Sequence, residues 1–233
     1  MLTTAVFFAA GCKPENEPSG GSTGHTDDYE WVDLGLPSGT LWATCNLGAY
    51  GKPENYGNFF AWSNTTLMAL FNWSAHWYSN GNTNELTKYC SQSYDGFNGY
   101  VDTLTVLQPN DDAATAHWGE GWRMPTKAEW DELRNKSSFT WTEVNGVNGG
   151  LFTGPNGNTI FLPAAGLRCE GTEPHQEGST QFNVGIEGFY WSSSLSISDP
   201  ISAWVFDFYS DGCYINWQDR YLGLSIRPVR SAR

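Results

Sequence analysis

Side chains suited to ligand binding are concentrated near the C-terminal end of the chain. Residues 189–224 contain ten aromatic side chains, seven serines and four aspartates, and Arg220 is their only basic residue. Tyrosine and tryptophan provide large contact areas at a low cost in side-chain entropy, while serine, asparagine and aspartate provide adaptable hydrogen bonds. The segment therefore predicts a surface that binds by shape and polar complementarity.

Alternation along an expected strand divides part of this segment into an inner and an outer face. Between 202 and 209, Trp204, Phe206 and Phe208 share one face, because successive side chains of a strand point to opposite sides. We expect these three aromatic residues to be core and their neighbours to be exposed.

The predicted binding residues are the outer face of the strands and the loops that join them. In the strand expected at 214–219, Ile215 and Trp217 point inward, and Ile226 and Val229 of the last strand are expected to be buried. The predicted ligand-contacting set is Ser196, Ser198, Asp199, Val205, Asp207, Tyr209, Asp211, Tyr214, Asn216, Gln218, Asp219, Tyr221, Leu222 and Leu224. The alternative is that this set is only the solvated face of an antiparallel sheet.

Residue types that carry catalysis or bind metals show no productive spacing. The four histidines form no His-Glu-x-x-His motif, and no two cysteines are spaced as Cys-x-x-Cys. Residues 108–112 and 217–219 offer only a faint calcium-ligand pattern, and the pair Asp111 and Asp112 is equally well explained as the start of a helix. We expect no catalytic residue, no metal and no cofactor.

Charge and composition exclude two further classes of protein. The chain has 25 acidic against 12 basic residues, a formal net charge of −13, so a nucleic-acid backbone would be repelled. It also has 12 Trp, 11 Tyr and 13 Phe, which is far too aromatic for a disordered chain. We expect contact with a membrane only through a lipid anchor.

The N-terminal residues are typical of an exported protein. Residues 2–10 form an apolar run too short to span a bilayer, and the segment 1–12 ends at Cys12 as a bacterial lipoprotein signal does. The alternative is an ordinary cleaved secretory signal. Residues 13–28 are predicted to be a flexible tether and 29–233 a single domain, whose four remaining cysteines could form two disulfides with the pairing left open.

Local signals in the domain predict short strands and little helix, an α+β fold. The clearest helix begins at Thr126, which forms a capping box with Glu129, and a shorter one is expected at 112–117. Turn residues predict hairpins that join 30–34 to 40–46 and 151–153 to 158–162.

Several sequence runs in this domain resemble one protein family. The chain is similar to the Fibrobacter succinogenes major paralogous domain family, common in lipoproteins of gut Bacteroidetes, over nearly all of 29–229. The runs that carry the resemblance are YEWVDLGLPSGTLWA (29–43), YGNFFAW (56–62), WRMPTKAEW (122–130), FLPAAG (161–166), YWSSS (190–194) and SIRPV (225–229).

The resemblance implies a C-type-lectin-like domain related to the formylglycine-generating-enzyme branch and to the variable proteins of diversity-generating retroelements. It further implies an outer-membrane or cell-surface lipoprotein that binds an extracellular protein or glycan without catalysis, as a receptor or adhesin does. Two alternatives remain: a structural subunit of a surface or fimbrial assembly, and, more remotely, an oxidase of the formylglycine-generating type that uses Cys213. The sequence leaves the oligomeric state open.

Overall fold

The computed structural model describes residues 29–170 and 178–232. The predicted signal segment, the tether and Cys12 lie outside these residues. Among the described residues, strands pair into four small antiparallel sheets. The first has the order β1 (Trp31–Asp33), β2 (Thr40–Ala43) and β11 (Val229–Ser231), and the second has β10 (Gly212–Asp219), β9 (Ser202–Tyr209) and β8 (Gly188–Leu195). The third is β3 (Ser138–Val144), β4 (Val147–Thr153) and β5 (Thr159–Pro163), and the last is β6 (Leu167–Glu170) with β7 (Ser179–Phe182).

The expected α+β class with a C-type-lectin-like architecture is wrong. Strands account for 36% of the structure and helices for 13%, so the fold is mainly β. Only α1 (Ala113–Trp118) and α2 (Lys127–Lys136) are α-helices among the described residues. The physical reason is that helix-starting signals occur at just these two places, while glycine, asparagine and aromatic residues dominate elsewhere and favour turns and strands.

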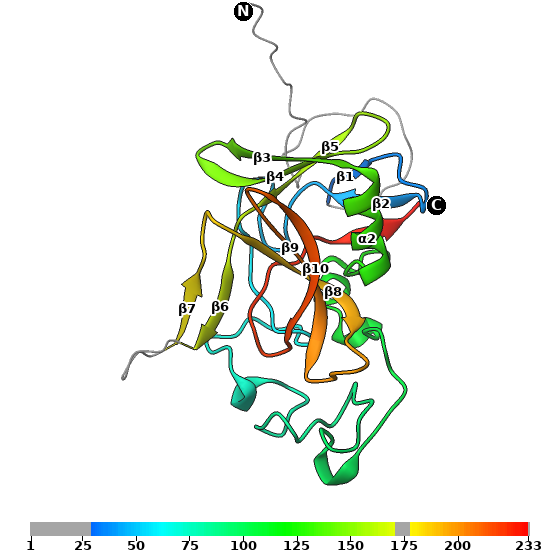
Figure 1. Cartoon of the computed structure of the whole chain (residues 1–233), viewed down its shortest axis with the longest axis vertical. Coiled ribbons are helices and arrows are strands. Elements are labelled where there is room, and N and C mark those ends of the chain that lie inside the picture. Colours follow the sequence, from blue (N-terminus) through cyan, green and yellow to red (C-terminus); the bar gives the residue numbers. More distant parts are fainter. Residues whose placement is uncertain (1–28, 171–177, 233) are drawn as a thin grey trace, which may run out of the picture.

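The sheet β8–β9–β10 lies at the centre of the molecule, with the β3–β4–β5 sheet above it and the β6–β7 hairpin to the lower left (Figure 1). Helix α2 packs on this central sheet through Trp130, whose ring stacks on Phe206 at 4.6 Å. On the opposite face, Val205 belongs to a second core cluster that contains Trp62 and Leu224. Both faces of β9 are therefore covered by protein around Val205 and Phe206.

The long connection between β2 and α1 contains only 3-10 turns, η1 (Trp73–Ala75), η2 (Phe97–Gly99) and η3 (Pro109–Asp111), and no named strand. Arg220 attaches it to the sheet: its buried guanidinium donates to the carbonyl oxygens of Tyr89 and Pro200 at 3.2 and 3.1 Å. The same guanidinium lies 4.9 Å from the centre of the Trp62 ring. This segment is therefore held by hydrogen bonds and a cation–π contact from one buried guanidinium, rather than by strand pairing.

Local predictions made from the sequence are largely confirmed. Helix α2 begins after Thr126 with the expected capping box, and both hairpins form as β1–β2 and β4–β5. Ile226 and Val229 are buried, as predicted. Cys90, Cys169 and Cys213 are free, so the four cysteines of the domain do not form the two disulfides that the sequence allowed, whereas Cys45 is disulfide-bonded.

The α2 N-terminus also holds a charge pair that reaches the first sheet. Glu129 accepts two hydrogen bonds from the Arg123 guanidinium, at 2.7 and 2.6 Å, and one from the Thr40 hydroxyl at 2.8 Å. Burial raises the pKa of Glu129, but the hydrogen bonds from Arg123 and the Thr126 backbone outweigh it and lower the pKa to about 2. The charged form therefore stabilises the fold.

We expect this pair to make stability depend on pH in acid. Because the folded pKa of Glu129 is depressed, its contribution is complete above the unfolded value near 4.5 and is lost as pH falls towards 2. At pH 7, Glu129→Gln should lower the free energy of unfolding by about 3 kcal/mol, and the gap should close between about pH 5 and pH 2. Urea titrations of both proteins across this range measure the gap, and a gap that is constant with pH would contradict the assignment. Glu120→Gln, which removes an exposed carboxylate, is the control and should change stability little.

Candidate functional site

Two stacked tyrosines mark the open face of the β9–β10 hairpin. Tyr209 and Tyr214 lie 5.2 Å apart with their ring planes 16° from parallel, and Tyr214 is 38% exposed. The register that pairs Gly212 with Tyr209 places no side chain between the two rings. A hydrogen bond between the two hydroxyls raises the pKa of Tyr209 to about 12, so this phenol is neutral at physiological pH.

A carboxylate and an amide lie beside the tyrosine pair. Asn216 donates from its side-chain amide to both carboxylate oxygens of Asp207, at 3.1 and 2.9 Å. Burial raises the pKa of Asp207, and burial together with the charge of Asp207 raises that of Glu187. Asn216 is exposed, so the polar group that the face offers to a ligand is the fixed amide rather than the carboxylate behind it.

Nine of the fourteen predicted binding residues reach the surface. Ser198, Asp211, Tyr214 and Asn216 are exposed, and Asp199, Tyr209, Gln218, Asp219 and Tyr221 are partly exposed. The remaining five are corrections, since they are buried: Ser196, Val205, Asp207, Leu222 and Leu224. Val205, Leu222 and Leu224 belong to a second core behind the sheet, and at Val205 the alternation rule had assumed solvent on that side. Ser196 is buried where its backbone N–H donates to Ser202, and Asp207 is buried beside the Asn216 amide.

The structure does not bring the nine residues into one patch. Tyr209, Tyr214 and Asn216 gather around Asp207, whereas Tyr221 lies 5.3 Å from Trp73. Asp199 and Asp219 form a separate acidic group with Asp95. Burial raises the pKa of Asp95 and of Asp219, and the negative charge of Asp199 raises both further. The contacts therefore limit the predicted binding surface to the tyrosine pair and its polar neighbours.

Trp217 was predicted to point inward, and this is wrong. Its side chain is 55% exposed on β10, which is an edge strand, and its ring meets the ring of Trp204 edge-on at 5.9 Å. The ammonium of Lys127 lies 4.8 Å from the Trp204 ring. This second aromatic pair was missed, because strand alternation alone does not show whether other residues cover a face of an edge strand.

The carboxylates considered for calcium are used within the fold. Asp112 caps α1 by accepting from the Thr115 backbone at 3.0 Å, as its position predicted, and Asp111 forms an ion pair with Lys88 at 2.6 Å. Within 29–170 and 178–232, no group of three or more His, Cys, Asp or Glu side chains could hold a metal ion. No helix in the same residues is long and apolar enough to cross a membrane.

The structure gives no support to a paired-cysteine oxidase. Cys213 packs against the core beneath α2, whereas Cys169 packs against the core on the other side of the sheet. Burial raises the pKa of both thiols, which keeps them in the less reactive protonated form.

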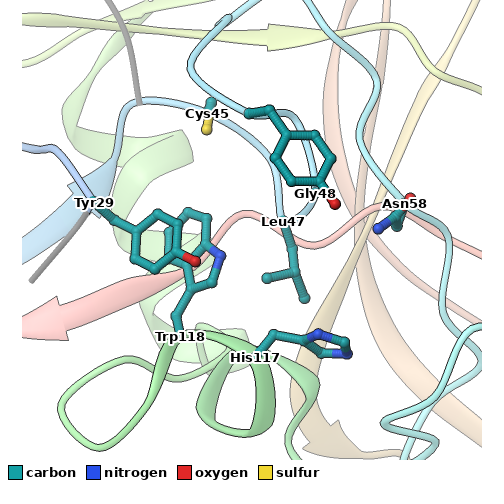
Figure 2. Close-up of a pocket in the computed structure, with 8 residues that line it drawn as sticks. Tyr29, Cys45, Leu47, Gly48, Asn58, His117 and Trp118 are labelled. Carbon is teal, nitrogen blue, oxygen red and sulfur yellow. The ribbon is translucent and has the colours of Figure 1, made fainter. Parts of the chain in front are cut away.

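A pocket of about 110 Å³ lies apart from this face, at the end of α1 (Figure 2). Its lining comes from residues far apart in the sequence: Tyr29, Cys45, Leu47, Gly48, Tyr50, Asn58, His117 and Trp118. No sequence motif pointed to it, because its lining combines the end of α1 with residues from separate parts of the chain.

Comparison with known proteins gives one partial match. No curated protein and no solved structure matches the chain at a significant level. Residues 135–229 match the model of a family described as a domain of unknown function, DUF8237. The matched residues include β8, β9 and β10 and exclude every residue that lines the pocket.

Proposed function

We propose that the protein is a non-catalytic ligand-binding protein of the bacterial cell surface, which binds an extracellular protein or glycan on the β9–β10 hairpin. The observation that carries this proposal is the exposed, stacked pair Tyr209–Tyr214 beside the Asp207–Asn216 hydrogen bonds. Each tyrosine orders the other before any ligand arrives, so binding pays little additional side-chain entropy. Aromatic residues in such positions commonly dominate interface energetics.

Export and anchoring belong to the same proposal and depend on the sequence. The apolar run 2–10 shortly before Cys12, and the resemblance to the Fibrobacter succinogenes major paralogous domain family, support a lipid-anchored surface protein. Diversification by a retroelement fits only part of the C-terminal segment, since Val205 and Leu224 are fully buried and substitution there would disturb the core.

The double variant Tyr209→Ala, Tyr214→Ala tests the binding face. On arrays of mammalian glycans and of purified extracellular-matrix proteins, wild-type signals should fall by about 100-fold, the loss expected when two aromatic anchors are removed. The thermal midpoint should change by only about 3 °C, because both rings lie outside the core clusters.

Tyr94→Ala is the matched control, since Tyr94 is 67% exposed and lies elsewhere, and it should keep wild-type binding. Unchanged array signals for the double variant would refute the proposed face. A large fall in its thermal midpoint would show instead that the two rings stabilise the fold.

One observation favours a second function, that of a subunit in a surface assembly. Strand β10 is an edge strand that also carries the exposed Trp217, and such edges pair readily with another chain. Light scattering of the full chain distinguishes the two, because an assembly subunit should form oligomers that grow with concentration and a receptor domain should not.

A further inference from the structure

The pocket beside α1 has the size of a single ring. Its volume of about 110 Å³ is somewhat smaller than a cavity of roughly 150 Å³ that admits benzene. The pocket is open to solvent, so a ligand ring can sit in it with one edge outside. Figure 2 shows Tyr29 and Trp118 on one side of the space, with His117 and Asn58 towards the other.

Rigid apolar groups form one wall. The rings of Tyr29 and Trp118 stack at 3.9 Å and 9°, and Trp118 in turn meets Trp122 edge-on at 5.0 Å. Leu47 is 2% exposed at the pocket lining. Tyr50, which is 84% exposed, forms the outer rim. This wall favours contact with the C–H groups of a ligand.

His117 offers a hydrogen-bond acceptor. Its Nε2 lies 2.8 Å from the carbonyl oxygen of Thr65, and a carbonyl can only accept, so Nε2 carries the hydrogen. In the neutral ring Nδ1 is then an acceptor, and it has no partner among the described residues. Edge-on contact with Phe60 at 5.3 Å fixes the orientation of the imidazole.

Asn58 offers both a donor and an acceptor. Its backbone N–H donates to the Leu47 carbonyl at 2.8 Å, whereas its side-chain amide makes no hydrogen bond to any residue that the structure describes. Gly48 leaves room for this amide: a Cβ at that position would lie 2.3 Å from Asn58 Nδ2. The backbone of Gly48 has a φ of +82°, which also favours glycine.

The chemistry of the lining selects the ligand class. Among residues 29–170 and 178–232, no Asp, Glu, Lys or Arg lines the pocket, so these residues offer a charged ligand no counter-charge for the hydration that it would lose. A purely apolar ring would cover the Asn58 amide and His117 Nδ1 and leave them unpaired. A neutral ring with hydroxyl groups satisfies both, because each hydroxyl donates and accepts while the ring C–H groups contact the apolar wall. We propose that this pocket binds one residue of a neutral carbohydrate, independently of the β9–β10 face.

Titration of the full chain with simple sugars tests the proposal without any substitution. Glucose, galactose, mannose and N-acetylglucosamine are added separately, up to about 50 mM, while amide and indole NMR signals are recorded. At least one sugar should produce saturable shifts of the Asn58 side-chain amide and the Trp118 indole, with a Kd of about 1–10 mM. Absence of saturable shifts at these two groups for all four sugars would overturn the proposal.

A single substitution then identifies the polar contact. Asn58→Leu keeps the approximate volume and removes both hydrogen-bonding groups, so the Kd for the bound sugar should rise about tenfold. Asn84→Leu is the matched control, since Asn84 is exposed and lies outside the lining, and it should leave the Kd unchanged. An unchanged Kd for a folded Asn58→Leu protein would overturn the assignment.

The pocket and the β9–β10 binding face can be tested independently of each other. Tyr209→Ala with Tyr214→Ala should leave the sugar shifts at Asn58 and Trp118 unchanged, because neither tyrosine lines the pocket. Loss of those shifts in the double variant would contradict an independent pocket.

Discussion

Replacing Trp130 by alanine is expected to lower the free energy of unfolding by about 5 kcal/mol. The indole is fully buried, stacks on Phe206 at 4.6 Å with parallel planes, and lies 4.7 Å from Trp42. It is therefore the point at which α2, the central sheet and the first sheet meet. Its Nε1 donates to the Trp191 carbonyl at 3.2 Å, so truncation leaves a cavity and an unpaired acceptor as well. Urea unfolding followed by circular dichroism measures the loss.

Trp217→Ala is the comparison for this variant. Its indole is more than half exposed, and we expect a loss of about 1 kcal/mol or less. If the two tryptophan variants lost similar stability, the central position of Trp130 in the core would be refuted.

The second large effect is expected at Arg227, which is fully buried. Its guanidinium donates to Asn46 Oδ1 at 3.0 Å and to the carbonyl oxygens of Ala43 and Phe161 at 3.0 and 2.8 Å. Burial lowers the pKa of Arg227 to about 10, so the group remains charged at neutral pH. Arg227→Met leaves three buried acceptors without donors and should cost about 4 kcal/mol, or about 8–16 °C in the thermal midpoint.

A surface arginine provides the control for charge removal alone. Arg134 forms a partly exposed pair with Asp131 at 3.2 Å, and Arg134→Met should cost about 0.5 kcal/mol or less. A fall of less than about 2 °C for Arg227→Met would show that water replaces the lost donors.

The features predicted correctly from the sequence are those encoded within a few residues. Thr126 and Glu129 are three positions apart, and the capping box needs no other part of the chain. The turn at 154–157 likewise fixes the β4–β5 hairpin through its own backbone. Such local signals hold whatever the surrounding fold is.

The predictions that failed depended on what covers each strand. Alternation separated the two faces of β9 correctly, yet it gave no information that Trp62 and Leu224 cover the face that carries Val205. The α+β assignment failed because it gave two short helices the same weight as the strands, whereas strands account for 36% of the structure and helices for 13%. The burial of a residue and the fold class depend on contacts between residues that are distant in sequence, and these contacts cannot be read from one amino-acid sequence.

The candidate sites also differ in whether their residues are close in sequence. Tyr209 and Tyr214 lie five positions apart across a hairpin and were predicted. The pocket joins Tyr29, Asn58 and Trp118, and His117 had been classed only as one of four scattered histidines. Asn58 and His117 become neighbours only when the fold is complete.

The pairing of β11 with β2 has a consequence for biosynthesis. Val229 lies opposite Trp42 and Ser231 opposite Thr40, so strands about 190 residues apart complete one sheet. A ribosome would have to synthesise everything from β2 to β11 before these two strands could pair, which delays closure of this sheet during synthesis. For a protein exported as proposed, that delay would keep the polypeptide unfolded and competent for translocation, and the domain would complete its folding after it has crossed the membrane.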